Sequence, residues 1–580
     1  AVVRYYPRIL TWSLAHKKTF LAIPVVVVLT GLLIWQGTGS LLGFMPERVK
    51  QTGAYEAMER TFPGIGKEFM PTLDEGSFLL MPTTMPHSGV AENLEVIRIL
   101  DKRVNAIPEV DNVVGKWGRV NSALDPAPIS MFENVINYKP EYMLDEQGHR
   151  LRFRVNREGA FLLEDGSTYQ PGEDEYRTVS KDELIPDRRG QYFRQWRDHI
   201  ESPDDIWKEI TNAAKVPGLT SAPKLQPIET RLVMLQTGMR APMGIKVSGP
   251  DLEAIEQTGF ALEEAMKEVE GVTPASVFAD RVVGKPYLEI DLDRDALARH
   301  GLTIGKVQEI LGSAVGGKPL TSTVEGRERF PVRVRYARER RDNPEALKEL
   351  LIPTPAGARI PLQELASIEY TRGPQMIRSE NTFLTGYVIF DKEDGYAEVD
   401  VVENAREHLS GLIEEGSLEI PAGVSYRFAG NYENQVRATK RLSLVIPISL
   451  VIIFLILYFQ FRSVITSGLI FSAILVAFSG GFIMLWLYGQ PWFMNFTVGE
   501  VGFRELFQIR TVNLSVAVWV GFIALFGIAT DDGVLISTYL KQTFDRKAPA
   551  TVDEVRAGVL EAGMKRVRPA MMTTATTIIA

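Results

Sequence analysis

Two adjacent carboxylates, Asp531 and Asp532, lie inside an apolar stretch that is long enough to cross a membrane, residues 515–540. A carboxylate in the bilayer core costs at least about 2.5–3.5 kcal/mol on insertion scales, so it is rarely kept without a function. We therefore predict that the pair takes part in a proton or ion relay. The alternative is structural: one Asp faces water at a break in the helix, and the other caps a backbone group.

Long apolar runs and a large polar middle alternate along the chain. Its 580 residues are 45% hydrophobic and 23% charged. A spanning helix needs about 20 mostly apolar residues, and four segments qualify, at 20–37, 442–461, 465–488 and 515–540. A fifth begins near Met571. No small-residue cleavage site follows the first segment, so we interpret it as a span rather than a signal peptide. We expect the chain to be part of a longer membrane protein, open at both ends.

Basic residues predict the orientation of these spans. They precede the first span, occupy the turn between the second and third, and follow the fourth, at Arg4, Arg8, His16, Lys17, Lys18, Arg462, Lys541, Arg546, Lys547, Lys565, Arg566 and Arg568. Since alternating spans bring all of them to one side, the positive-inside rule makes that side cytoplasmic. Residues 38–441 and 489–514 then lie outside.

The net charge and the lack of cysteine exclude several kinds of site. A net charge of −8 argues against a nucleic-acid surface. A sequence without cysteine has no disulfide, no thiolate metal site and no cysteine nucleophile. An outside segment of roughly 400 residues must then be held by hydrophobic cores, and it is long enough for several of them.

The outside segment contains a repeated strand–helix–strand unit. A strand at 78–84, an amphipathic helix at 90–104 and a strand near 110–116 form the first copy, and the same order returns from residue 243 to about 279. A third instance is expected from 383, through a helix near 399–413, to 424–428. Apolar residues spaced by three and four make each helix cover one face of a sheet. The units predict split βαβ, ferredoxin-like subdomains.

The predicted fold class is a multi-pass α-helical membrane protein with large α+β subdomains outside the membrane. Two polar excursions interrupt the pattern, a β-rich insertion at about 138–197 and a short one at 489–514. The predicted boundaries are an amphipathic cytoplasmic segment (1–19), a span (20–37), a first α+β subdomain (38–242), a second one in two parts (243–280 and 373–441), a small α/β subdomain between them (281–372), three spans (442–461, 465–488 and 515–540), a cytoplasmic loop (541–570) and the start of a further span (571–580).

This order of elements resembles the C-terminal half of a resistance–nodulation–division (RND) efflux pump, and local strings narrow the resemblance to the heavy-metal branch. The strings are KEFMPTLDEGSFLLMPTTMP (67–86), PIETRLVMLQTGMRAPMGIKVSG (227–249), SAVGG (313–317) and RVRP (566–569). The resemblance covers most of the chain apart from the two excursions. It implies that the two α+β subdomains are periplasmic porter subdomains and that 281–372 is a docking-type subdomain.

The resemblance implies a metal site of three methionines, as in the CusA-type copper/silver exporters of that branch. The matching positions are Met81, Met131 and Met234. A thioether is neutral and soft, so it favours Cu(I) and Ag(I) over harder divalent ions. The alternative is that these residues are ordinary core fillers, since the chain has 17 methionines. We interpret the nearby Met70, Met85, Met239 and Met243 as core rather than as relay ligands.

The resemblance also implies charged residues that shape the field of the metal cleft. The matching residues are Glu75, Asp125, Glu133, Arg231 and Arg240, the last often Lys in relatives. Ordinary surface ion pairs are the alternative. Asp531 matches a proton-relay acid and Asp532 is an extra one, whereas the relay lysine that some relatives carry after RVRP is Ala570 here.

The function that follows from the resemblance is proton-driven Cu(I)/Ag(I) efflux through the inner membrane of a double-membraned bacterium. The resemblance implies a homotrimer with a periplasmic adaptor and an outer-membrane channel, and the metal is cargo, so no resident cofactor is expected. The first alternative is a Zn/Co/Cd pump of the same branch, whose site would favour carboxylate and His ligands. Multidrug export and a membrane sensor or scaffold are further alternatives. An intramembrane aspartyl protease is disfavoured, because adjacent residues on a helix point about 100° apart.

Overall fold

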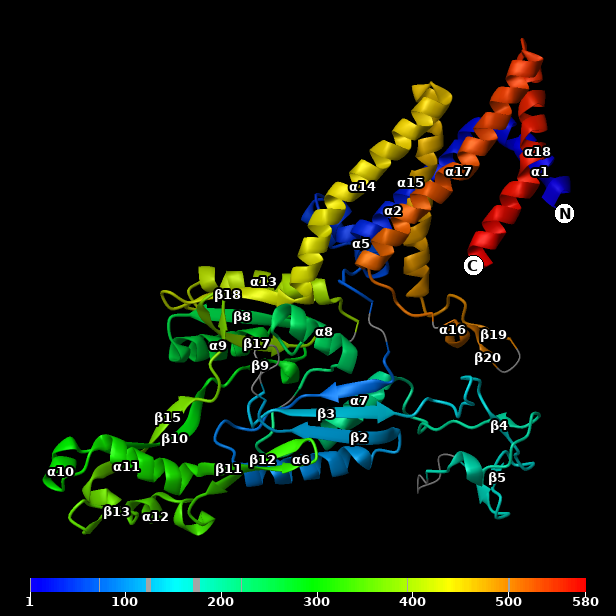
Figure 1. The fold of residues 1–580 in the computed structure, drawn as a ribbon. Helices are drawn as coiled ribbons and strands as arrows, with labels where there is room; N and C mark the ends of the chain where they lie inside the picture. Colours follow the sequence, from blue (N-terminus) through cyan, green and yellow to red (C-terminus); the bar gives the residue numbers. More distant parts are fainter. Residues whose placement is uncertain are drawn as a thin grey trace.

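Long helices and α/β subdomains occupy opposite ends of the molecule (Figure 1). The computed structural model describes residues 2–71, 74–120, 127–170, 178–220, 222–393, 395–498, 501–507 and 509–579. Both termini lie in the helical end (Figure 1). The predicted cleft residue Asp125 is outside the described residues.

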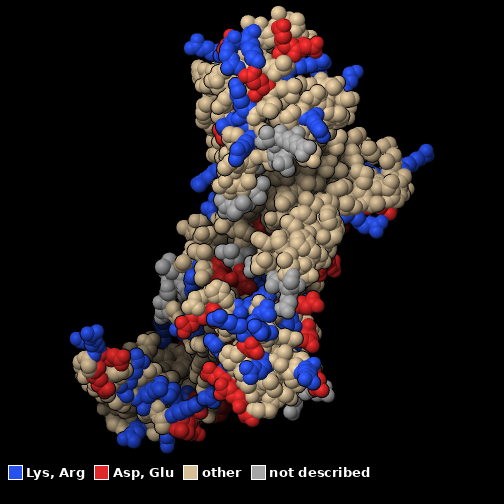
Figure 2. Space-filling model, turned by 90° about the vertical axis from the view of Figure 1, so that its right-hand side faces the viewer, with Lys and Arg blue, Asp and Glu red and all other residues tan. Residues whose placement is uncertain are grey.

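The helical end contains four helices that are long and apolar enough to span a membrane: α2 (Lys17–Gln36), α14 (Asn431–Phe461), α15 (Val464–Tyr488) and α17 (Val516–Lys547). The other helices of this end are α1 (Val2–Ala15), α3 (Thr38–Leu42), α4 (Glu47–Lys50), α5 (Gly53–Thr61) and α18 (Val552–Ile579). Figure 2 shows that these spans form a band with few charges, between a charged tip and the charged α/β subdomains. Such a band matches the apolar interior of a bilayer.

Close packing around α15 holds the bundle together. A Cβ atom added at Gly31 of α2 would lie 2.4 Å from the Ser479 Cβ of α15, so only glycine fits at this crossing. Aromatic rings fill the space beside it, with the Phe478 and Phe522 centroids 4.7 Å apart and the Trp35 and Phe482 rings stacked at 5.1 Å. Packing of this kind stabilises helix association where lipid removes the hydrophobic driving force.

Two helices extend beyond the segments predicted to lie in the membrane. The second span is predicted from residue 442, and its helix α14 already begins at Asn431, with polar first turns. The predicted cytoplasmic loop, 541–570, is largely helical, since α17 runs to Lys547 and α18 begins at Val552. Basic residues on those helix ends are held by Glu561, which contacts Arg546, Lys547 and Lys565. The charged residues near Lys547 mark the end of the apolar part of α17, although the helix itself continues through them.

The first α/β subdomain is a three-stranded antiparallel sheet in the order β1-β3-β2, packed against helices. Its elements are β1 (Ser77–Leu80), α6 (Val90–Asn105), β2 (Val110–Trp117), β3 (Phe132–Tyr138) and α7 (Pro203–Ala213), and α8 (Pro227–Thr237) follows. Leu100 of α6 and Ile206 of α7 are buried with strand residues in one core. The predicted strand at 78–84 stops at Leu80, since Pro82 cannot donate to a ladder.

The second α/β subdomain is a sheet in the order β16-β17-β8-β18, with β9 also paired to β17. Its elements are β8 (Met243–Gly249), α9 (Leu252–Met266), β9 (Phe278–Ala279), β16 (Ser379–Glu380), β17 (Phe383–Phe390), α13 (Glu398–Glu414) and β18 (Ser425–Gly430). Leu262 of α9 and Val401 of α13 share one core with the strands. The interleaved strand order is that of a split βαβ unit, so the third predicted repeat forms the second half of this subdomain.

Two insertions extend from these sheets. The paired strands β10 (Val283–Leu292) and β15 (Ala366–Pro374) connect the second sheet to a small subdomain. The elements of this subdomain are α10 (Arg294–Arg299), α11 (Ile304–Leu311), β11 (Lys318–Glu325), β12 (Glu328–Val334), α12 (Pro344–Lys348), β13 (Leu351–Pro353) and β14 (Arg359–Pro361). The other insertion has a separate core around Phe153 and Phe193, with the short strands β4 (Arg152–Phe153), β5 (Phe161–Leu162), β6 (Thr168–Tyr169) and β7 (Gln191–Tyr192). They lie on opposite sides of the α/β end (Figure 1).

Candidate functional site

The three predicted methionines come together in one cluster of the first α/β subdomain. Met81 follows β1, Met131 directly precedes β3, and Met234 lies on α8. Met81 and Met131 are each 3% exposed, and Met234 is partly buried against them. Thr83 and Met131 form a β-bridge, so the two chain segments that carry Met81 and Met131 run side by side. Three distant segments therefore bring their thioether side chains into one apolar cluster.

Glu75 positions the helix that carries Met234. Its carboxylate accepts hydrogen bonds from the backbone N–H groups of Ile228 (2.8 Å) and Glu229 (2.9 Å), in the first turn of α8. Gln226, just before the helix, accepts a hydrogen bond from the Glu75 N–H at 2.7 Å. A carboxylate at a helix N-terminus satisfies unpaired N–H groups and opposes the positive end of the dipole. Glu75 is thus a positioning residue for Met234.

Glu133 is the acidic group nearest the methionine segments in sequence and is 6% exposed. Its Oε2 atom lies 2.5 Å from the Lys116 Nζ and 3.8 Å from the Arg231 Nη2. Its Oε1 atom is buried and has no hydrogen-bond partner among the described residues. Side chains two apart on a strand share a face, so Glu133 points to the same side as Met131. The sequence did not identify Lys116, whose cross-strand pairing with Glu133 appears only once β2 and β3 are in register.

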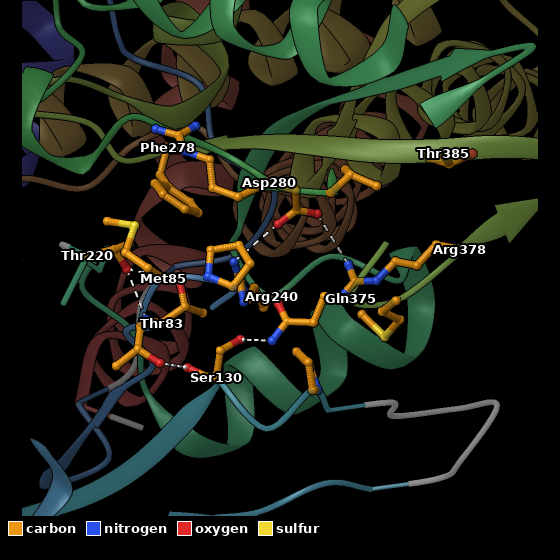
Figure 3. A pocket seen from close by; sticks show the side chains of 16 residues that line it. Thr83, Met85, Ser130, Thr220, Arg240, Phe278, Asp280, Gln375, Arg378 and Thr385 are labelled. Carbon is orange, nitrogen blue, oxygen red and sulfur yellow. Dashed lines mark hydrogen bonds and ion pairs between the residues drawn. The ribbon is translucent and has the colours of Figure 1, made fainter. Parts of the chain in front are cut away.

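Arg240 lies outside the methionine cluster, in a neighbouring cavity of about 50 Å³ that Thr83 and Ser130 also line. Its Nη2 atom donates to the Asp280 Oδ1 at 3.2 Å, and the Arg378 Nη1 lies 3.6 Å from the Asp280 Oδ2. Figure 3 shows the Asp280 carboxylate between the two guanidinium groups. Burial, together with the charge of Arg378, lowers the pKa of Arg240, and Asp280 opposes this shift. Arg240 is thus paired with Asp280 of the second α/β subdomain, at a cavity that residues of both subdomains line.

Two acids, one in the first turn of α8 and one close to it, have raised pKa values, and neither was predicted from the sequence. Glu398 at the start of α13 is 8% exposed, and Asn431 of α14 donates to its Oε2 at 3.2 Å. Burial, and then the negative charge of Glu229, raise the pKa of Glu398 to about 8. Burial and the charge of Glu75 raise the pKa of Glu229. The fold therefore favours the protonated form of Glu398, close to the helix that carries Met234.

The aspartate pair lies within the membrane-spanning part of α17, as predicted. Asp531 is exposed on the surface of the chain and Asp532 is half-buried. The helix is continuous through this point, and the hydroxyl of Thr530, just before the pair, donates to the Phe526 and Gly527 carbonyls at 3.2 and 2.9 Å. A helix break, the structural alternative for the pair, is not observed.

Four other methionines were predicted to be core, and this was right for two of them. Met239 and Met243 are 0% and 1% exposed in the second α/β subdomain. Met70 and Met85 are 52% and 36% exposed, so that prediction was wrong for them. Both lie close to prolines, which prevent the regular strand that would have buried them. Among the described residues, no group of three or more His, Asp or Glu side chains could hold a metal ion.

Comparison with known proteins identifies the class of this protein. The AcrB/AcrD/AcrF family matches residues 192–503 and 506–580, and the chain belongs to this family. With its four apolar helices, it is a multi-pass protein of the bacterial inner membrane. The predicted RND fold is confirmed by the crystal structure of a heavy metal efflux pump, which it matches with a TM-score of 0.69 at 22% identity over 99% of this chain and 47% of that one.

Its similar relatives are heavy-metal exporters, which confirms the predicted branch. The chain is 32% identical to the cation efflux system protein CusA of Escherichia coli K12 over 520 residues, which are 89% of this chain and 42% of that protein. The same identity and coverage relate it to the putative cation efflux system protein SilA of Salmonella typhimurium. It is 26% identical to the cation efflux system protein CzcA of Alcaligenes sp. CT14, over 88% of this chain and 40% of that protein. The chain therefore spans less than half the length of these relatives.

Proposed function

We propose that this chain is part of a proton-driven exporter of the soft monovalent ions Cu(I) and Ag(I), and that Met81, Met131 and Met234 bind the ion. The observation that carries the proposal is the meeting of these three side chains in one cluster. Neutral thioether ligands favour Cu(I) and Ag(I), and they bind without releasing a proton, unlike thiolates. A weakly held, exchangeable ion suits a protein that must release its cargo.

One negative charge, that of Glu133, lies on the side of Met131, and the positive charges of Lys116 and Arg231 oppose it. In a poorly solvated site such a charge acts over a longer range than in water. We assign to Glu133 the role of attracting the ion, and to Arg231 and Lys116 the role of preventing tight capture.

Transport by the whole protein would couple this site to the membrane. Asp531, with Asp532 beside it, is the proposed proton-relay group in α17, and proton antiport is the proposed energy source. The proposed assembly is a homotrimer with a periplasmic adaptor protein and an outer-membrane channel. Similarity to CusA and SilA supports the copper and silver cargo.

An anaerobic Cu(I) competition titration on the purified protein tests the site. We compare the wild type with a variant in which Met81, Met131 and Met234 are all replaced by Leu. The matched control replaces three exposed methionines, Met70, Met564 and Met571, by Leu. We expect the control to bind like the wild type and the cluster variant to lose at least tenfold in affinity, which is about 1.4 kcal/mol.

Two results would overturn the assignment. Equal Cu(I) binding by the wild type and the cluster variant would remove the three methionines from the site. Tight Zn²⁺ binding without Cu(I) binding would favour the divalent cargo that relatives such as the cobalt-zinc-cadmium resistance protein CzcA are named for.

A further inference from the structure

The segment between α15 and α17 forms a small folded unit at the periplasmic end of two membrane spans. We call residues 489–507 the aromatic lobe; its described part is 489–498 and 501–507. It contains β19 (Thr497–Val498), β20 (Val501–Gly502) and α16 (Phe503–Leu506). Figure 1 shows it beside the lower ends of α15 and α17, to the side of the bundle. Because α15 ends at Tyr488 and α17 begins at Val516, the lobe is tethered on both sides at the height of the membrane surface.

A single guanidinium holds the lobe in one shape. Arg504 Nη1 donates to the carbonyls of Gln490 (2.6 Å) and Phe493 (2.8 Å). Its Nη2 donates to the carbonyls of Tyr488 (3.3 Å) and Ile509 (3.2 Å). Tyr488 is the last residue of α15, so Arg504 also satisfies a terminal carbonyl and opposes the negative end of the helix dipole. The charge of Arg504 is thereby directed inward, toward the backbone.

The outer surface of the lobe is apolar and aromatic. The Phe503 ring lies 4.6 Å from the Phe496 ring and 4.5 Å from the Phe507 ring, measured between centroids. Five large side chains of the described part of the lobe are exposed, two of them in this stack: Trp492 (64%), Phe496 (49%), Val498 (65%), Leu506 (61%) and Phe507 (60%). Five of the 19 residues of the lobe are aromatic, against 9% in the whole chain. Contiguous exposed apolar surface of this kind marks a contact with a partner or a membrane.

We propose that the aromatic lobe lies in the headgroup region of the outer leaflet and anchors the periplasmic end of α15 and α17 to the lipid surface. Three observations favour lipid as the partner: tethering between two spans, an aromatic surface of the type enriched at membrane interfaces, and the inward direction of the Arg504 charge. The lobe thus belongs to the class of segments that lie on a membrane without crossing it.

Site-specific fluorescence quenching tests the proposal, because this chain contains no cysteine. Trp492→Cys and Leu506→Cys variants, each exposed at the replaced position, are labelled with an environment-sensitive dye and reconstituted in phosphatidylethanolamine–phosphatidylglycerol vesicles. The vesicles contain lipids with a nitroxide either on the headgroup or deep in the acyl chain. The control is Val324→Cys in the β11 hairpin, which is equally apolar and exposed (64%) but far from the spans.

We expect headgroup nitroxides to quench both lobe labels at least threefold more strongly than the Val324→Cys label. They should also quench the lobe labels more strongly than deep nitroxides do. Quenching no stronger than in the control would mean that water or another protein, such as a second copy, covers the lobe, and would overturn the proposal. Stronger quenching by the deep nitroxide would overturn the interfacial position. These outcomes do not depend on which metal is transported.

Discussion

Glu398 is a carboxyl group whose ionisation is opposed by the fold. It is 8% exposed, accepts a hydrogen bond from Asn431, and lies near the negative charge of Glu229. Since burial and that charge raise its pKa from 4.5 to about 8, the folded protein keeps its proton over a pH range in which the unfolded chain releases it. Stability falls as pH rises through this window, by up to about 1.4 kcal/mol per pH unit. This loss of stability is absent well below pH 4.5 and constant well above about pH 8.

The Glu398→Gln variant should therefore be more stable than the wild type at high pH. The gain in Tm should be close to zero near pH 4.5, grow up to about pH 8 and then level off. Thermal unfolding of both proteins in detergent, at a series of pH values, measures it. Glu414→Gln, an exposed acid at the end of the same helix, is the control and should give no pH-dependent difference. A pH-independent difference for Glu398→Gln would contradict the raised pKa.

Residue types and local strings predicted part of the site. Met81, Met131 and Met234 were predicted, and their cluster forms; Asp531 and Asp532 were predicted inside a span, and they lie there. The partners Lys116 and Asn431 could not be predicted, because each meets its acid only through long-range pairing. Arg240 was assigned to the metal cleft, but its guanidinium contacts Asp280 in the adjacent cavity.

At the scale of the helices, the position of α8 depends on Glu75, a residue that is distant from it in sequence. Replacing Glu75 by Ala removes the acceptor for two N–H groups of its first turn and should cost about 1 kcal/mol. Since α8 carries Met234, Cu(I) affinity should fall about fivefold. The competition titration measures this, with Glu92→Ala in the first turn of α6 as the control. Unchanged affinity in Glu75→Ala would mean that the helix is held without it.

The crossing of α2 and α15 has no room for a side chain. Gly31→Ala places a methyl group 2.4 Å from the Ser479 Cβ and should destabilise the bundle by about 1–3 kcal/mol. Gly521→Ala in α17 meets no atom within 4 Å and serves as the control. Thermal loss of helical circular dichroism in detergent compares them, and an equal Tm for both variants would show that the crossing can relax.

Periodicity predicted the elements of the α/β end better than their pairing. The helices at 90–104 and 399–413 were predicted to within about two residues, because their apolar faces repeat every three or four positions. Residues 243–280 and 373–441 were predicted to share one subdomain, but the strand register of β17 against β8 was not predicted, because more than a hundred residues separate the two strands. Strand pairing over such a distance depends on tertiary packing rather than on local pattern.

At the scale of the whole molecule, the methionine cluster lies in the α/β end and the aspartate pair in the helical end, so the proposed transport requires coupling between them. In the whole protein, Asp531→Asn should reduce metal-driven proton flux in proteoliposomes at least tenfold while leaving Cu(I) affinity unchanged. Asp532→Asn should have a smaller effect. Asp545→Asn, near the cytoplasmic end of the same helix, is the control. Normal flux in Asp531→Asn would remove this residue from the relay.

The helix α14 starts at Asn431, immediately after β18 ends at Gly430, and continues to Phe461 without a linker. Its 31 residues make a rod about 46 Å long, at 1.5 Å per residue. Such a rod is a lever arm: a tilt of about 5° at one end moves the other by about 4 Å. Pro447 interrupts the hydrogen bonds of this helix, so the helix can bend there and transmit less of the displacement. A tilt of α14 within the membrane would therefore displace β18, to which it is directly joined.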